Sequence, residues 1–235
     1  MRLIWDEQGI KWFLDASAYT GFHKSLAQKI IPHLEQGDTL CDAGCGLGRL
    51  DLELAPFVSN LTAVDINENA IEVLRRDAGR FGFCNLQADV CDASSLTGLF
   101  DIVLMSFFGQ LDTLDFLKLC RRKLIRIVSS NNNSNFYPER YKCDAKETVP
   151  KVCDGLDALG VIYKLEYCSI EFGQPLLSMQ DAEMYILRNA PGASAEEALE
   201  FLDEHIIHTG RDDFPLFLPN LKELGIFVID RSSSK

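Results

Sequence analysis

The fold of this chain is decided by residues 39–48, which read TLCDAGCGLG. The first half is a short, mostly apolar run of strand length, and the second half has glycine at every second position. Glycine lacks a Cβ and tolerates positive φ, so such a turn brings bare backbone close to a ligand. Apolar residues then recur at helical spacing and predict a helix over 49–58. A strand, a glycine-rich turn and a helix together surround a nucleotide-like cofactor with N–H donors.

Three further apolar segments of strand length follow this turn, and two of them carry an acid near their end. The segment 61–66 contains Asp65, and the segment 85–90 contains Asp89. Nucleotide-binding α/β folds place a carboxylate at the end of the second strand, where it accepts hydrogen bonds from ribose hydroxyls. The next segment, 99–109, is nearly all apolar, which predicts a strand buried on both faces of a parallel sheet.

In order and spacing, these segments resemble the S-adenosylmethionine-dependent methyltransferases of the Rossmann-like (class I) type. The resemblance covers roughly the first two-thirds of the chain. It implies an α/β fold with a Rossmann-like, seven-stranded, mostly parallel sheet that is flanked by helices and has an antiparallel last strand. The stretch between the last two predicted strands is too long for a hairpin loop and has helical patterns of its own, so we expect a helical insertion there.

By this resemblance, the turn and the strand ends hold S-adenosyl-L-methionine, whose product is S-adenosyl-L-homocysteine. The turn backbone would hold its amino-acid and ribose end, and Asp42 would support the methionine ammonium through water. Asp65 would accept from both ribose hydroxyls, as a carboxylate can. Ile66 would pack on the adenine face, and Asp89 would receive the exocyclic amine. The predicted cofactor residues are Asp42, Gly44, Cys45, Gly46, Gly48, Asp65, Ile66, Asp89, Val90, Ser106 and Phe107.

A nicotinamide or flavin oxidoreductase shares the strand, the turn and the ribose acid. Its fingerprint needs three glycines in the pattern G-x-G-x-x-G, and position 49, where the third would fall, is Arg49. Asp42 and Asp89 fit the methyltransferase pattern and have no place in the dinucleotide fingerprint. The sequence therefore favours the methyltransferase.

Composition and charge narrow the class of acceptor. The 235 residues are 47% hydrophobic and carry a formal net charge of −12, whereas nucleic-acid binding depends on cationic residues. The basic cluster 121–123 with Arg126 is expected between a helix over 112–120 and a strand over 124–128, as favourable charge at a helix C-terminus. The segment 106–109 also lacks the Asn/Asp-Pro-Pro-aromatic motif common in methyltransferases of base amines. We expect a small-molecule acceptor and no nucleic-acid partner.

Neither a membrane span nor a signal peptide is expected, which makes the cytoplasm the predicted location. The eight cysteines contain no C-x-x-C pair and are expected to be reduced thiols. His205 and His208 are predicted one turn apart on a helix, a spacing that suits a metal, but no third ligand is evident, so no metal is predicted.

The predicted organisation has four parts. They are an N-terminal helical lead or cap at 1–36, the cofactor-binding core at 37–172, a helical insertion at 173–225, and a last strand with its tail at 226–235. Within the insertion, helices are expected over 179–189, from Ser194 to about His208, and from Asn220. The insertion is either a cap over the acceptor pocket or a stabilising or dimer surface. The oligomeric state stays open, and a homodimer is compatible with the sequence.

Five side chains are candidates for the acceptor pocket: Trp12, Tyr19, Phe22, His23 and Phe108. His23 could act as a general base if the acceptor must lose a proton, or could have a surface or capping role. No catalytic residue is assigned.

The sequence thus predicts a methyltransferase that moves a methyl group to a small-molecule acceptor by direct in-line displacement. The alternative is a non-catalytic, S-adenosylmethionine-binding regulatory subunit of a partner enzyme. Asp42, Asp65 and Asp89 all occupy positions of the methyltransferase cofactor pattern, which favours the enzyme.

Overall fold

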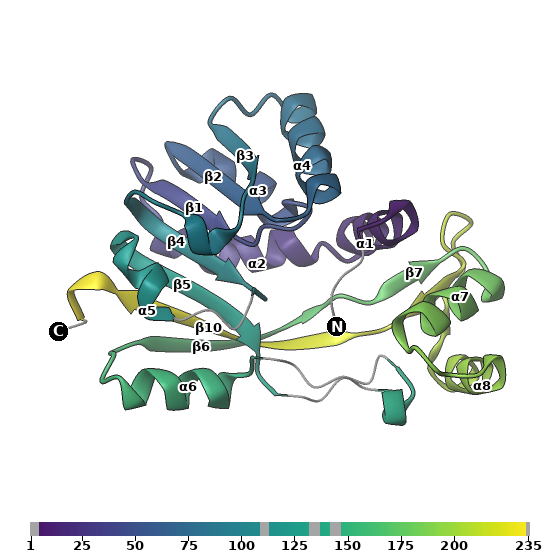
Figure 1. Cartoon of the computed structure of the whole chain (residues 1–235). Coiled ribbons are helices and arrows are strands. Elements are labelled where there is room, and N and C mark those ends of the chain that lie inside the picture. Colours follow the sequence, from purple (N-terminus) through teal and green to yellow (C-terminus); the bar gives the residue numbers. More distant parts are fainter. Residues whose placement is uncertain (1–4, 109–112, 132–136, 142–146, 234–235) are drawn as a thin grey trace. The chain divides into compact units, whose positions relative to one another are not determined.

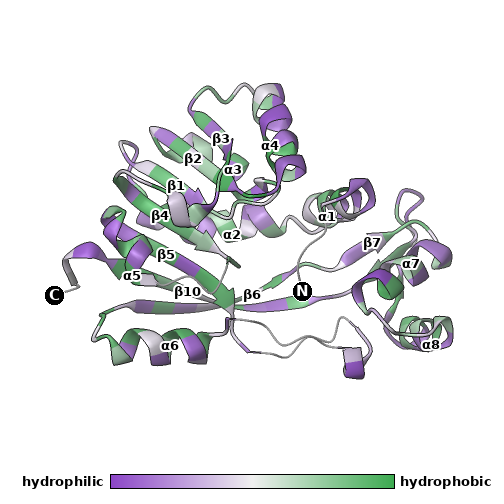
Figure 2. Ribbon diagram, viewed as in Figure 1, coloured by the Kyte–Doolittle hydropathy of each residue, from purple (hydrophilic) through white to green (hydrophobic). Residues whose placement is uncertain are grey.

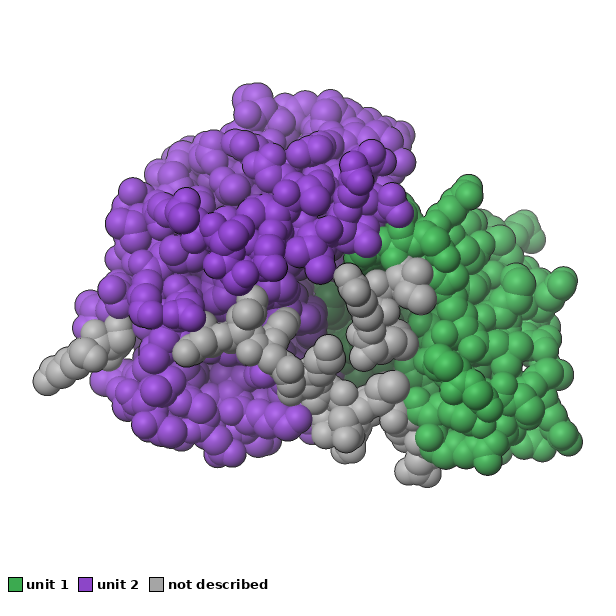
Figure 3. Space-filling view, viewed as in Figure 1, with its two compact units in different colours: residues 1–22, 132–145, 169–222 green, residues 23–131, 146–168, 223–235 purple. Residues whose placement is uncertain are grey.

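The computed structural model describes residues 5–108, 113–131, 137–141 and 147–233 (Figure 1). The chain divides into two compact units, coloured separately in Figure 3. Unit 1 consists of Met1–Phe22, Asn132–Ala145 and Ser169–Lys222, and unit 2 of His23–Asn131, Lys146–Cys168 and Glu223–Lys235.

Unit 2 is built on a seven-stranded sheet with the strand order β3-β2-β1-β4-β5-β10-β6. Strands β1 to β5 pair in parallel, and β10 runs antiparallel to β5. The strands are β1 (Thr39–Ala43), β2 (Asn60–Asp65), β3 (Leu86–Val90), β4 (Phe100–Ser106), β5 (Cys120–Ser129), β6 (Lys164–Glu171) and β10 (Leu221–Asp230). The predicted fold class, a mostly parallel seven-stranded sheet with an antiparallel last strand, is confirmed.

Helices flank this sheet (Figure 1). They are α2 (Phe22–Ile30), α3 (Arg49–Leu54), α4 (Glu68–Phe81), α5 (Thr113–Lys118) and α6 (Val149–Ala158), with 3-10 turns η1 (Ile31–His33), η2 (Ala55–Phe57), η3 (Ala93–Ser95) and η5 (Arg231–Ser233). Local signals set their ends: α4 begins where the Asn67 side chain accepts from the Ala70 N–H, and ends at Gly82 in the left-handed region. The predicted helix over 49–58 is α3 followed by η2.

The central strands are buried on both faces, as their apolar sequences predict. Val103, Leu104, Ile125 and Ile127 have no exposed surface, and neither does Phe227 on β10. Figure 2 colours much of β4 and β5 as hydrophobic. Burial of these side chains provides the hydrophobic stabilisation of unit 2 and holds the strand ends in fixed register.

Unit 1 combines helices with a small sheet. Its elements are α1 (Glu7–Thr20), η4 (Glu139–Tyr141), α7 (Met179–Asn189), α8 (Ala195–His205), and the antiparallel strands β7 (Gln174–Leu176), β9 (Leu216–Leu218) and β8 (Ile207–His208) in the order β7-β9-β8. A capping box of Ser194 and Glu197 begins α8. Among the described residues, no helix is both long and apolar enough to cross a membrane.

The insertion contains the expected helices α7 and α8, and it also contributes β7, β8 and β9, which the sequence does not predict because strands of two or three residues are too short for a recognisable alternation. Two other expectations about the insertion are wrong. The helix expected from Asn220 is instead the start of β10, which is buried from Leu224 to Ile229. Finally, α8 ends at His205 and His208 lies on β8, so the two histidines do not share a helix.

The basic cluster also lies elsewhere than expected. Arg121, Arg122, Lys123 and Arg126 all belong to β5, so they do not cap a helix C-terminus. Arg122 pairs with Glu35 and Asp38, and Lys123 donates to the His33 carbonyl at 3.1 Å. The fold places acids and carbonyls that are distant in sequence next to these cations, so the cluster did not have to lie at a helix end.

Candidate cofactor site

The glycine-rich turn joins β1 to α3 and is held against β2. The N–H groups of Gly44 and Cys45 donate to the Val64 carbonyl at 2.8 and 3.0 Å. Gly44, Gly46 and Gly48 all have positive φ, at 81°, 54° and 65°. A Cβ on Gly44 would lie 2.1 Å from the Phe108 ring, so glycine is needed there both for its conformation and for its size.

Asp65, at the end of β2, is tied to the same turn. Its Oδ2 accepts from the Gly46 N–H at 3.0 Å, and its Oδ1 accepts from the Asn67 N–H at 2.9 Å. A carboxylate has about four acceptor positions, so two hydroxyl groups could still bind. The structure therefore brings together the turn and the acid that the sequence predicts at the ribose.

Exposed apolar side chains follow the ends of neighbouring strands. Ile66 after β2 is 58% exposed, Val90 at the end of β3 is 47% exposed, and Phe107 after β4 is 49% exposed. Phe107 also has a left-handed φ of 52°, which is uncommon for a bulky residue. These three predicted site residues lie at the carboxyl edge of the sheet, where open α/β sheets bind their ligands.

Other predicted residues have protein partners. Asp89 accepts from Gln87 Nε2 at 2.8 Å and from Arg75 at 3.4 Å. Ser106 ends β4, paired in register with Ile127. Burial raises the pKa of the Cys45 thiol well above its usual value, so Cys45 contributes to the turn through its backbone and as a neutral thiol.

Asp42 and Asp51 form a buried acidic pair beneath the turn. Asp42 on β1 is 1% exposed, and Asp51 on α3 has no exposed surface. Burial and the charge of the other acid raise the pKa of Asp42, and burial raises the pKa of Asp51 to about 7. Sequence reasoning missed Asp51, although an acid beside Leu50 and Leu54 on the buried face of a short helix was the available signal.

The acceptor-pocket candidates divide between the two units. In unit 2, Phe108 lies against Gly44 and packs edge-on against Phe116. Burial, with the nearby charge of Arg49, lowers the pKa of His23 to about 3, so its imidazole is neutral near neutral pH and a weak base.

In unit 1, Trp12 and Phe22 belong to the core. Trp12 is 4% exposed and donates from Nε1 to Asp181 at 3.0 Å, an arrangement that packing explains without a ligand. Phe22 is likewise buried and packs on Phe172. Tyr19 stacks on Phe217 with a centroid separation of 5.0 Å.

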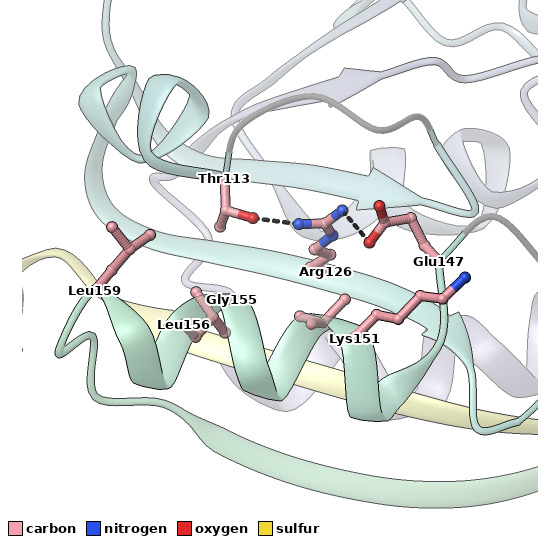
Figure 4. A pocket seen from close by; sticks show the side chains of 8 residues that line it. Thr113, Arg126, Glu147, Lys151, Gly155, Leu156 and Leu159 are labelled. Atoms are coloured by element: carbon pink, nitrogen blue, oxygen red, sulfur yellow. Dashed lines mark hydrogen bonds and ion pairs between the residues drawn. The ribbon is translucent and has the colours of Figure 1, made fainter.

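A separate pocket of about 190 Å³ lies beside β5 and α6 (Figure 4). Arg126 occupies its centre, bonded to Thr113 and, at 3.0 Å, to Glu147. Its lining residues are Thr113, Arg126, Glu147, Lys151, Val152, Gly155, Leu156 and Leu159, none of which is a predicted cofactor residue.

No metal centre is formed by the part of the chain that the structure describes, since no three His, Cys, Asp or Glu side chains gather there in a suitable group. His205 donates from Nδ1 to the Phe201 carbonyl at 2.8 Å and stacks on the Phe201 ring. These contacts account for its position.

Comparison with known proteins finds methyltransferases, both in a family model and in a curated relative. Residues 34–190 match the methyltransferase domain family. The probable cobalt-precorrin-6B C(15)-methyltransferase (decarboxylating) of Methanosarcina acetivorans is 26% identical over 150 residues, which are 61% of this chain and 75% of that protein.

Two solved structures have a similar fold. The SAM-dependent methyltransferase of Aquifex aeolicus is 15% identical, with a TM-score of 0.57 over 96% of this chain and 99% of that one. The BH2331 protein of Bacillus halodurans C-125 is 15% identical, with a TM-score of 0.60 over 88% of this chain and 98% of that one. At this identity the likeness concerns the fold.

The strand order and the glycine turn at the carboxyl edge define a Rossmann-like enzyme of the class I methyltransferase type. The chain belongs to the methyltransferase domain family.

Proposed function

We propose that this protein binds S-adenosylmethionine at the carboxyl edge of β1, β2, β3 and β4 and transfers its methyl group to a small-molecule acceptor. The observation that carries the proposal is the junction of the glycine turn with Asp65, whose carboxylate accepts from the Gly46 N–H at the carboxyl edge of the sheet. The buried Asp42 fits the cofactor as well, because its Oδ1 has no hydrogen-bond donor among the described residues and would be satisfied by a cation.

The roles follow from these positions. Asp65 would accept from the ribose hydroxyls, Ile66 and Val90 would cover the adenine, and Asp89 would receive its amine. Phe107 would border the reacting end of the site. S-adenosylmethionine supplies a methyl group already activated on a sulfonium, so the protein has to position the two reactants and exclude water. No base is assigned.

A small-molecule acceptor is favoured by the net charge of −12, which opposes binding to nucleic acid. The relative from Methanosarcina acetivorans is named for a cobalt-precorrin, a tetrapyrrole, and a tetrapyrrole is therefore the first acceptor class to test. The role of residues 173–225, as a cap or an oligomer surface, stays a prediction.

Calorimetric titration tests the proposal. S-adenosylmethionine and S-adenosylhomocysteine should both bind, and NAD, as the control, should not. Transfer of labelled methyl to a panel of tetrapyrroles and other small molecules then tests the enzyme. Binding without transfer to any acceptor would favour the regulatory subunit, and no binding of either adenosyl ligand would refute the cofactor assignment.

A further inference from the structure

The buried pair of Asp42 and Asp51 is unusual in its protonation and, among the described residues, in its shortage of hydrogen-bond donors. Both carboxyl groups are buried, burial raises both pKa values, and the charge of Asp51 raises that of Asp42 further, so the pair keeps one proton. Within the described part of the chain, no donor forms a hydrogen bond of normal geometry with either oxygen of the Asp51 carboxyl or with Oδ1 of Asp42. The pair thus holds one proton and leaves acceptor capacity unused.

The surrounding charges do not neutralise this pair. Arg49, on the same helix as Asp51, lowers the pKa of that acid, but its guanidinium donates to Asp77 at 2.8 Å. Asp65 on β2 adds negative charge and raises the pKa of Asp42. The nearby thiols of Cys41 and Cys45 have raised pKa values and stay neutral, and His23, beside Arg49, is neutral as well.

We propose that Asp42 and Asp51 exchange their shared proton for the ammonium group of the cofactor's methionine part, so that binding releases one proton to solvent. The inference rests on the proposed function and adds Asp51 to the binding site. The exchange balances in charge: one proton on two carboxyls gives −1, and two carboxylates with one ammonium also give −1. A buried site with unpaired charge is costly, which favours such an exchange over simple addition of the cation.

The sign of the pH dependence follows from linkage. Because binding releases a proton, affinity falls as pH falls through the range in which the free pair is protonated. The cofactor's own α-amino group, with an ordinary pKa of about 7.7–8.0, remains charged below pH ~7. Between pH ~7 and ~5.5 we therefore expect Kd to rise by up to about tenfold per unit.

The test is calorimetric titration at pH ~6.5 in two buffers of different ionisation enthalpy, which counts protons. S-adenosylmethionine and S-adenosylhomocysteine should each release up to about one proton, since both carry the ammonium. 5′-Methylthioadenosine lacks it and should release none. Binding of both amino-acid-bearing ligands without proton release would overturn the inference and leave the proposed function standing, whereas failure of both to bind would refute the proposed function itself.

Two substitutions on α3 test whether Asp51 is needed for the release of the proton. Asp51→Asn can donate to Asp42 without a proton to lose, so binding should persist while proton release and the pH slope disappear. Glu53→Gln removes an acid from the same helix and should keep both. Unchanged proton release in a folded Asp51→Asn protein would overturn the role of Asp51. If that variant does not fold, the comparison of the three ligands on the unmodified protein still decides.

Discussion

At the scale of single residues, Asp65 has two tasks. It accepts from the Gly46 N–H and thereby fixes the turn, and it keeps acceptor positions for the proposed ribose hydroxyls. A carboxylate in this position contributes charge-assisted hydrogen bonds, which are stronger than neutral ones. Loss of this one side chain should thus affect the cofactor more than the fold.

Asp65→Ala should weaken S-adenosylmethionine binding by roughly 1.5–3 kcal/mol, the range for a hydrogen bond to a charged group. Calorimetric Kd values measure this change. Asp115→Ala, which removes an exposed acid on α5, is the matched control and should leave Kd unchanged. Equal affinities of the Asp65→Ala and unmodified proteins would refute the ribose role.

Residue-level reasoning from the sequence had a clear limit at Asp51. Acids that follow apolar strands could be placed, because strand ends are marked by hydrophobic runs. Asp51 could not, because its chemistry depends on contact with Asp42 across β1 and α3, and only the folded chain brings the two together. Trp12 was likewise assigned to a pocket by composition, while the structure gives it a buried partner, Asp181.

At the scale of elements, the core strands were predictable and the insertion was not. Long apolar runs and the glycine turn determine β1, β2 and β4 locally. The strands β7, β8 and β9 are too short to show an alternation of polar and apolar residues. They are defined by their pairing with one another, which the local sequence does not reveal. The start of β10 has Leu221 and Leu224 three residues apart, a spacing that predicts a helix, although the segment forms a strand of the sheet.

The packing of the turn between β1 and α3 can be tested by comparing alanine substitutions at two glycines. Gly44→Ala combines a strained φ of 81° with a clash against Phe108, whereas Gly82→Ala has a similar φ of 76° and open space. The left-handed conformation costs about 1–2 kcal/mol in each, and the clash adds about 1–3 kcal/mol in Gly44→Ala. Denaturant unfolding measures the difference.

Truncation of the ring, as Gly44→Ala with Phe108→Ala, should recover part of the stability difference beyond what the two single changes predict. If Gly44→Ala and Gly82→Ala are equally destabilised, the contact with Phe108 does not constrain the turn.

At the scale of the whole molecule, the proposed cofactor residues all belong to unit 2, while unit 1 has a core of its own. Leu202 is fully buried in that second core. Leu202→Ala should destabilise unit 1 by about 2–5 kcal/mol through lost burial and a cavity. S-adenosylmethionine affinity should not change at temperatures where the protein remains folded.

Thermal unfolding and calorimetric titration on the same samples check both parts of this prediction. Leu224→Ala, in the buried part of β10, is the matched change in unit 2. A large loss of cofactor affinity in folded Leu202→Ala would mean that the binding site depends on unit 1.

The position of β10 has a consequence for the nascent chain. This strand is the last of the sheet to leave the ribosome, yet it lies between β5 and β6 and pairs with β5 over Leu224–Asp230. Until it emerges, the backbone edge of β5 has no neighbour on that side, and β6 has no strand through which to join the sheet. Edges of this kind invite aggregation during synthesis. Completion of the sheet therefore waits for the synthesis of the last of its strands, and a chain interrupted before residue 221 would retain the residues of the glycine turn without a finished sheet to hold them.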